Sequence, residues 1–340
     1  MAVGRTKKAT LNDVAVYSGV SYQTVSRVIN DHLNVAEATR RRVLKAIEEL
    51  DYRPNRAARS LVTRRSQTVG IISYGLGYYG PAQMVMNIES AVRRRGYGLA
   101  LTTIEELSLP ELSRAINDLV SQNVDGIVMI TPIADIDPKM ITMLCAETPL
   151  VMVDTDPNER IPAVAIDQRH GAKLATQHLI DLGHRNICKI SGPLNWYDAR
   201  LRHEGWLATL HESGLTPGLS FEGDWTAARG YAAMQQLLDT ETGFSAVVVG
   251  NDQMALGALR ALRERGLKVP DDISVVGFDD VPEAAYFEPP LTTVRQDFKA
   301  LGQQSIEHLM ALIEAPDGPL LQRVLWPHLV VRLSTMRALG

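Results

Sequence analysis

The chain has 340 residues, of which 45% are hydrophobic and 22% are charged, a composition typical of a globular protein with more than one domain. Residues 1–65 hold thirteen Lys and Arg against six Asp and Glu, whereas the remainder holds twenty-two against thirty-three. A basic N-terminal segment on an acidic body indicates a polyanionic partner for that segment alone. The sequence has no apolar run of about eighteen residues and no apolar signal region, so we exclude a membrane protein and expect a cytoplasmic one.

The first predicted elements are two short helices. Thr10 and Asp13 have the spacing of a capping box, which predicts a helix that begins at Leu11. Gly19 supplies a stop, and Ser21 is placed to cap a second helix. The tight turn that contains Gly19 therefore predicts a helix-turn-helix.

The second of these helices has two different sides. Val25, Val28 and Ile29 form an apolar side. The opposite side presents polar residues that can read base edges, namely Tyr22, Gln23, Ser26, Arg27 and Asn30. Gln and Arg make bidentate hydrogen bonds to adenine and guanine in the major groove. The alternative is an ordinary helical hairpin at the surface.

A third helix is predicted from Ala36 to Leu50, and the three helices form a headpiece over residues 1–54. The helix carries a basic run, Arg40 to Arg42 with Lys45. These side chains either contact phosphates, which position a protein without specifying sequence, or form a solvated helix face. Tyr52 and Asn55, with the flanking Arg53 and Arg56, are similar phosphate candidates.

Residues 55–66 form a linker in which Asn55 is placed to cap a short helix from Arg56 to Val62. One or two turns are too short to be stable alone in water. Such a segment orders on DNA and melts on release, or it is a disordered tether without contacts.

From Thr68 onward, short apolar strands alternate with helices, which predicts an α/β fold with parallel sheets covered on both faces. Two successive rounds of this pattern indicate two doubly wound modules. The strands expected in the first round are 69–72, 99–102, 126–130 and 150–153, and the helices are 83–95, 111–122 and 138–146. The strands of the second round are 187–190, 221–223, 246–249 and 273–276, with a last strand at 329–332. Its helices are 170–182, 200–213, 229–238 and 254–265.

Polar residues follow several of these strands. Asp154, Asn251 and Asp279 each lie at or after a strand end, and Arg200 is expected to begin the helix after strand 187–190. Ligands of α/β sheets bind beyond the carboxyl ends of strands. Carboxylates, an amide and a guanidinium in one cleft suit a polyol. For Asp154 and Asp280, a role in capping a helix or holding a loop remains the alternative.

Five sequence blocks, in order, resemble the LacI/GalR family of bacterial transcription regulators. The first is the segment from Thr10 to Asn30, in which SYQTVSRV resembles the family's recognition helix. The others are 52–61 with Tyr52, Pro54 and Asn55; 182–185; 251–255 with 273–280; and 290–294. The resemblance covers nearly the whole chain, and it implies a two-lobed fold like that of periplasmic binding proteins.

By this resemblance, residues 67–340 form an effector-binding and dimerisation core. One lobe takes about 67–166 and 295–325, and the other takes about 167–294 and 326–340, with crossings near Ile166, Val294 and Leu325. The resemblance also implies a homodimer on a near-palindromic operator. The leucine-heptad tail that ties dimers of the family into tetramers has no counterpart here, so we expect a dimer.

The resemblance also implies site residues. The DNA-binding set is Thr10, Leu11, Ser21, Tyr22, Gln23, Ser26, Arg27, Asn30, Thr39, Tyr52, Asn55, Ala58 and Leu61. Within it, Leu61 is the wedge that enters the minor groove, with Ala58 facing the groove. The ligand-binding set is Tyr74, Tyr78, Asp154, Trp196, Arg200, Trp225, Asn251, Asp279, Gln296 and Phe298.

In the ligand set, Arg200, Asn251 and Asp279 match sugar-hydroxyl contacts of the family. Trp225 matches the aromatic residue that packs on the pyranose face, with a role in the core as its alternative. Tyr74, Tyr78 and Trp196 stand where the galactoside-binding pattern of the family has small or aliphatic residues. The sugar is therefore a galactoside or another sugar, acting as inducer or corepressor.

The predicted function is a repressor of a carbohydrate-utilisation operon that a sugar releases from its operator. A free sugar-binding transport protein is the second hypothesis, which the basic headpiece and the missing export signal oppose. An enzyme is the third; His170, His184 and His203 are available for acid–base work, but none lies in a recognisable catalytic motif. We expect no cofactor and no metal, and the two cysteines, Cys145 and Cys188, are expected to be reduced core thiols.

Overall fold

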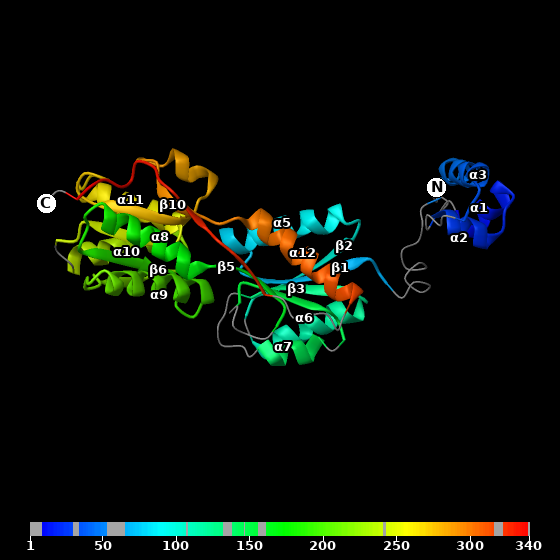
Figure 1. Ribbon diagram of the computed structural model, residues 1–340, viewed down its shortest axis with the longest axis horizontal. Coiled ribbons are helices and arrows are strands. Elements are labelled where there is room, and N and C mark those ends of the chain that lie inside the picture. Colours follow the sequence, from blue (N-terminus) through cyan, green and yellow to red (C-terminus); the bar gives the residue numbers. More distant parts are fainter. Residues whose placement is uncertain are drawn as a thin grey trace, which may run out of the picture. The chain divides into compact units, whose positions relative to one another are not determined.

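The computed structural model describes residues 9–29, 34–52, 65–106, 108–131, 138–145, 147–155, 161–240, 243–315 and 322–338. It divides into two compact units, Met1–Ser66 and Gln67–Gly340, which we call the headpiece and the core (Figure 1). The predicted linker helix lies outside the described residues, as do Asn30, Asn55, Ala58 and Leu61.

The headpiece holds three helices among its described residues, α1 (Leu11–Ser18), α2 (Tyr22–Ile29) and α3 (Glu37–Glu49). The capping box is confirmed, because the Thr10 backbone N–H donates to Asp13 Oδ2 at 2.7 Å and the Asp13 N–H donates to Thr10 Oγ1 at 3.3 Å. Gly19 ends α1 with a φ of 63°, a left-handed conformation that glycine adopts without strain. The helices enclose a small core that includes the fully buried Val14, Val25 and Val43.

The first lobe of the core, which we call lobe N, is a parallel six-stranded sheet of order β11-β5-β4-β3-β1-β2. Its strands are β1 (Thr68–Tyr74), β2 (Gly98–Ile104), β3 (Gly126–Ile130), β4 (Leu150–Val153), β5 (Ala163–Ile166) and β11 (Gln322–Leu325). Helices α5 (Tyr79–Arg94) and α12 (Phe298–Glu314) cover one face, and α6 (Leu109–Ser121) and α7 (Pro138–Cys145) cover the other (Figure 1).

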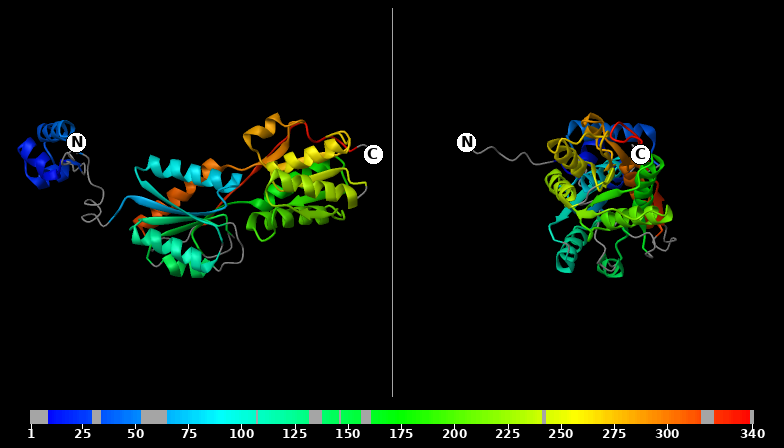
Figure 2. Two further views of the ribbon diagram at one scale, coloured as in Figure 1. Left: turned by 180° about the vertical axis from the view of Figure 1, so that it is seen from behind. Right: turned by 90° about the vertical axis from the view of Figure 1, so that its left-hand side faces the viewer.

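The second lobe, lobe C, is a six-stranded sheet of order β12-β10-β9-β8-β6-β7 in which β12 alone is antiparallel. Its strands are β6 (Ile187–Ser191), β7 (Ser220–Glu222), β8 (Ala246–Val249), β9 (Ser274–Asp279), β10 (Thr292–Arg295) and β12 (His328–Val330). Helices α8 (Gln168–Asp181) and α9 (Tyr197–Glu212) cover one face, and α10 (Ala227–Thr240) and α11 (Asp252–Glu264) cover the other (Figure 2). A 3₁₀ turn, η1, spans Pro282–Tyr286.

The described chain passes between the lobes at three connections, after β5, after β10 and after β11. Asp154, directly after β4, and Asp279, the last residue of β9, lie close enough to interact electrostatically. The expected α/β fold with parallel, doubly wound sheets is confirmed. Cys145 and Cys188 are buried and not disulfide-bonded, as expected.

Several element boundaries differ from the prediction. Helix α9 begins at Tyr197 and not at Arg200, and α5 begins at Tyr79 and not at Gln83. The residues before these helices, Trp196 and Tyr78, have no side-chain capping hydrogen bond, so no capping signal marks either start. Helix α12 was not predicted; ten of its residues are buried, which weakens the amphipathic pattern.

Candidate DNA-binding surface and ligand site

Helix α2 presents the polar face that its sequence indicates. Val25 and Val28 are buried in the headpiece core, while Tyr22 is 55% exposed and Gln23 and Arg27 are also exposed. The Ser21 hydroxyl accepts the Thr24 N–H at 3.2 Å and so caps the helix. A short rigid helix with free amide and guanidinium groups is able to enter a major groove.

The remaining predicted DNA contacts of the described headpiece fall into two groups. Thr10 and Leu11 lie at the start of α1, Ser26 and Thr39 are partly exposed, and Ser21 is exposed. Tyr52 differs, since its side chain is 8% exposed and packs in the headpiece core. The ring of Tyr52 therefore contributes to the headpiece core, and its contact with DNA stays a prediction.

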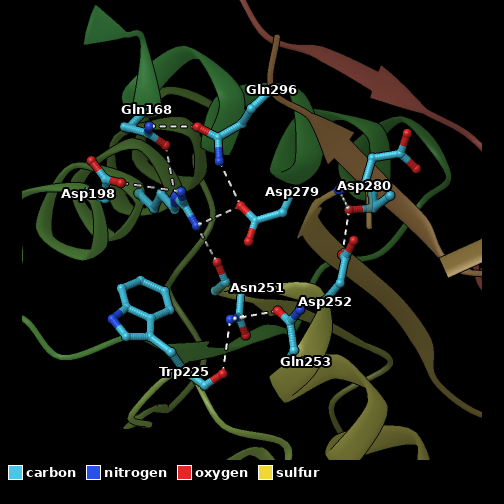
Figure 3. Close-up of polar contacts among 12 residues, drawn as sticks. Gln168, Asp198, Trp225, Asn251, Asp252, Gln253, Asp279, Asp280 and Gln296 are labelled. Carbon is cyan, nitrogen blue, oxygen red and sulfur yellow. Dashed lines mark hydrogen bonds and ion pairs between the residues drawn. The ribbon is translucent and has the colours of Figure 1, made fainter. Parts of the chain in front are cut away.

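In the core, a polar network gathers around the guanidinium of Arg202, in the second turn of α9. Arg202 Nε donates to Gln168 Oε1 at 2.9 Å, and Arg202 Nη1 donates to the Gly250 carbonyl at 2.7 Å. It also lies 3.6 Å from Asp198 and 3.6 Å from Asp279. Figure 3 shows these carboxyl and amide groups converging from α8, α9 and β9.

The network continues through two glutamines. Gln168 Nε2 donates to Gln296 Oε1 at 2.9 Å, and Gln296 Nε2 donates to Asp279 Oδ1 at 2.7 Å (Figure 3). Asn251 caps α11 by accepting the Met254 N–H at 2.9 Å, and its amide donates to the Trp225 carbonyl at 3.0 Å. These hydrogen bonds involve residues of five elements or their ends, namely α8, α9, α11, β9 and β10.

Aromatic side chains from both lobes form a wall beside this network. Trp196 packs on Tyr74 and Tyr78 of lobe N, with ring centroids 5.5 and 5.4 Å apart, and on Trp225 at 5.7 Å. A side chain at Gly192 would meet the Trp225 ring at 2.2 Å, so only glycine allows that ring to approach the backbone. Aromatic faces beside a few hydrogen-bonding groups are the usual lining of a small-molecule site.

Three residues of this region hold unusual backbone conformations. Asp154, Trp225 and Asp279 have φ values of 62°, 74° and 109°. Positive φ is costly for a bulky side chain, and such strain persists where surrounding contacts enforce it, often at ligand sites. The strained residues therefore mark the same region as the polar network.

Burial gives the carboxyl groups unusual proton affinities. Burial is the main cause that raises the pKa of Asp279, to about 6, although Arg202 and Gln296 oppose the rise. Burial and the neighbouring Asp279 also raise the pKa of Asp252, whose oxygens accept hydrogen bonds from the Thr293 hydroxyl and the Val281 N–H. Asp280 instead pairs with Arg295 and Arg332 and holds a loop, the structural role kept open for it.

The cavity at this network has a volume of about 30 Å³. Six residues predicted from the sequence line it, namely Tyr78, Trp196, Trp225, Asn251, Asp279 and Gln296. Tyr74 does not line the cavity but packs on Trp196, which does. Asp154 is also outside the lining and interacts electrostatically with Asp198, which is part of it. Phe298 also lies behind the wall, edge-on to Tyr79 with ring centroids 6.0 Å apart.

Arg200 requires a correction, because it does not line the cavity and its guanidinium lies over the Tyr197 ring at 5.7 Å. Arg202 lines the cavity in its place. Asp198, Arg202 and Tyr79 were missed. A helix start at Tyr197 would have revealed the first two, because Asp198 and Arg202 are four residues apart and share one face.

His184, one of the histidines available for acid–base work, is held by two hydrogen bonds. His184 bonds the Ser245 hydroxyl at 2.8 Å and the Met336 carbonyl at 3.0 Å, which makes it a structural residue. Within the described ranges, no cluster of three or more His, Cys, Asp or Glu is arranged to hold a metal. None of the described helices combines the length and the apolar character needed to cross a membrane.

Comparisons with known proteins agree with this architecture. The model for bacterial regulatory proteins of the lacI family matches residues 10–55, and that for periplasmic binding protein-like domains matches residues 176–335. The lactose operon repressor of Escherichia coli (strain K12) is 39% identical over 306 residues, which cover 90% of this chain and 85% of that repressor.

Two solved structures show the same likeness. The lac repressor dimer bound to operator and the anti-inducer ONPF superposes with a TM-score of 0.91 at 37% identity, covering 97% of this chain and 100% of that chain. The complex of the transcriptional regulator CelR with cellobiose superposes with a TM-score of 0.72 at 35% identity, covering 96% and 99%.

A helix-turn-helix headpiece followed by a two-lobed core with a ligand cleft defines a DNA-binding regulator controlled by a small molecule. The chain belongs to the LacI family of bacterial regulatory proteins. It is thus a transcriptional repressor by family and not an enzyme.

Proposed function

We propose that this repressor controls a carbohydrate-utilisation operon and leaves its operator when a sugar occupies the cleft of the core. The observation that carries the proposal is the Arg202 network beside the Trp196–Trp225 wall. It combines acceptors, donors and aromatic faces within one cleft. Sugar hydroxyls both donate and accept, and sugar C–H faces pack on aromatic rings, so this set suits a sugar.

The relatives narrow the sugars to be tested. One relative is a repressor of a lactose operon, and another was solved with cellobiose. The aromatic wall of this chain favours a sugar with an extended face, and a galactoside is the first candidate. Another sugar or sugar derivative is the alternative.

A thermal-shift panel tests the sugar proposal. A ligand that binds only the folded protein raises its melting temperature. At a concentration one hundred times its Kd, such a ligand adds about 2.7 kcal/mol to the free energy of unfolding. Lactose, cellobiose, galactose, glucose and ribose would be compared on the wild type and on Trp225→Leu, with Trp326→Leu as a control outside the cleft. We expect one sugar to stabilise the wild type and the control but not the Trp225 variant. A shift that survives in Trp225→Leu would place the sugar elsewhere.

On the DNA side, we propose that Tyr22, Gln23 and Arg27 read bases and that Ser21, Ser26, Thr39, Thr10 and Leu11 position the headpiece. Asn30, Asn55, Ala58 and Leu61, which lie outside the described residues, belong to the same proposal. So does the division into a headpiece of 1–54, a hinge of 55–66 and a core of 67–340. A homodimer would place two copies of α2 on the two half-sites of a near-palindromic operator, in the cytoplasm where bacterial DNA lies.

Selection of bound duplexes from a random pool tests the reading surface. Replacing Gln23 or Arg27 by Ala should relax one base position, with a loss of about 1–3 kcal/mol of discrimination for each bidentate pair. Arg41→Ala, on the exposed side of α3, serves as the contrast. The loss of a phosphate contact should weaken the affinity for all duplexes alike. Unchanged base preference in both α2 variants would show that another surface reads the operator.

A further inference from the structure

Helix α9 borders two different cavities. Asp198 and Arg202, four residues apart, line the cavity at the cleft described above. Tyr197, Leu201 and Gly205, also at intervals of four, lie on an adjacent face of the helix and line a second cavity, which we call the α8–α9 groove. The groove has a volume of about 580 Å³, whereas the cavity at the cleft has about 30 Å³. Among the described residues, none lines both cavities.

Both lobes contribute to the lining of the groove. Helices α8 and α9 of lobe C supply most of it, and lobe N supplies Ala165 and Ile166 of β5 and Val324 of β11. The solvent-accessible surface of the groove is mainly apolar. Small-molecule sites are concave, mostly apolar and about 300–1,000 Å³ in volume. The size and the lining of the groove therefore suit a small organic ligand.

One aromatic side chain in the groove is largely open to solvent. Trp326, directly after β11, is 65% exposed, whereas the other three tryptophans of the chain are at most 7% exposed. The His170 ring of α8 lies perpendicular to the Trp326 ring, with ring centroids 4.9 Å apart. Because aromatic rings gain from packing on one another and from leaving water, an occupant with an aromatic ring is favoured here.

The charged groups that line the groove are paired with one another. Arg169 Nε of α8 donates to Glu204 Oε2 of α9 at 3.0 Å, and Lys173 Nζ donates to Glu212 Oε2 at 3.1 Å. The third carboxyl group of the lining, that of Asp167, accepts a backbone N–H as the N-cap of α8. An ionic ligand would have to replace one of these partners, whereas an uncharged ligand replaces none. The groove therefore favours an uncharged occupant.

We propose that the α8–α9 groove is a second ligand site, separate from the sugar cleft, and that it takes an uncharged aromatic compound that packs on Trp326. Such a ligand contacts residues of both lobes. The proposal does not depend on the sugar assigned to the cleft, and it is tested without any sugar.

The first measurement uses the full chain labelled with fluorotryptophan, whose four tryptophans give four ¹⁹F resonances. Each resonance is assigned from the corresponding Trp→Leu variant. Indole is the uncharged probe, and indoleacetate and tryptamine carry a similar ring with a negative and a positive charge. Indole should shift the Trp326 resonance and leave those of Trp196 and Trp225 unchanged. The charged probes should bind about tenfold more weakly, because a charge that loses water without gaining a partner is costly.

The second measurement repeats the indole titration on a variant in which the groove is filled. Ala208 of α9 lines the groove and is exposed, so Ala208→Leu adds a side chain there and keeps Trp326. Ala311→Leu is the matched control, because Ala311 is exposed on α12 and does not line the groove. The affinity for indole should fall about tenfold or more in Ala208→Leu, a change of about 1.4 kcal/mol, and stay constant in Ala311→Leu.

Four results would overturn the proposal. They are the absence of any indole-dependent shift, a shift at Trp196 or Trp225 in place of Trp326, an equal response to the three probes, and an affinity for indole that is unchanged in Ala208→Leu.

Discussion

At the scale of single residues, Arg202 explains how three other buried polar side chains lie side by side in the core. Its donors serve Gln168 and the Gly250 carbonyl, and its charge faces Asp198 and Asp279. The ring of Phe278 lies 3.8 Å from the guanidinium carbon and covers its flat face. A planar group with five donors is suited to such a position, and lysine is not.

Removal of this guanidinium should be costly in a way that removal of Arg200 is not. Arg202→Ala leaves Asp198 and Asp279 buried without their cation, which should lower the free energy of unfolding by about 3–5 kcal/mol. Arg200→Ala removes an interaction with the Tyr197 ring that is worth about 1 kcal/mol or less. Urea denaturation of both variants measures the difference. Equal losses would mean that Arg202 is not the centre of the network.

Lys189 makes a separate prediction at this scale. It is 1% exposed, and its ammonium lies over the Trp206 ring at 5.9 Å. Burial lowers the pKa of Lys189 to about 7, so between about pH 7 and 10.4 the unfolded chain binds a proton that the folded chain does not, and stability rises with pH. Lys189→Met should remove this rise and stabilise the protein by a few kcal/mol at about pH 7. Unfolding free energies of both proteins from pH 7 to 10 test the sign; parallel curves would contradict it.

At the scale of elements, the sequence predicts strands better than helix starts. Strands such as β3 and β4 are buried along their whole length, so each reads as an uninterrupted apolar run. Helices α5 and α9 start after aromatic residues that pack into the cleft and supply no cap. The predicted start of α9 at Arg200 lies three residues after the observed start at Tyr197. Because helical phase decides which side chain of a helix faces a cleft, residue types alone do not separate Arg200 from Arg202.

The start of α1 illustrates the opposite case, in which a cap was visible in the sequence. Thr10 and Asp13 satisfy each other's backbone N–H groups. Replacement of Thr10 by Ala should therefore destabilise the headpiece by about 1 kcal/mol, the usual cost of a lost N-cap. Thr240→Ala, at the C-terminal end of α10 in the core, gives a control substitution outside the headpiece. Hydrogen exchange of the α1 amides measures the effect, and unchanged protection in Thr10→Ala would show that the cap contributes nothing.

At the scale of the whole molecule, the function depends on coupling between the headpiece and the cleft. The sequence predicts both parts, because the helix-turn-helix is local and the α/β pattern repeats. It does not reveal that residues of both lobes line one cavity of about 30 Å³, because this depends on contacts between residues far apart in the chain. An effector that binds one arrangement of the lobes more tightly than another shifts the population toward that arrangement, and differential binding of this kind is what permits control at a distance.

The most direct test is the affinity of the full-length protein for its selected operator duplex, measured by fluorescence anisotropy with and without the sugar that stabilises it most. A coupling of about 1–3 kcal/mol predicts that the sugar weakens operator binding roughly 5–150-fold. A scrambled duplex should bind weakly in both cases, and Trp225→Leu should keep operator affinity and lose the response. Operator affinity that is the same with and without a saturating sugar would contradict the account.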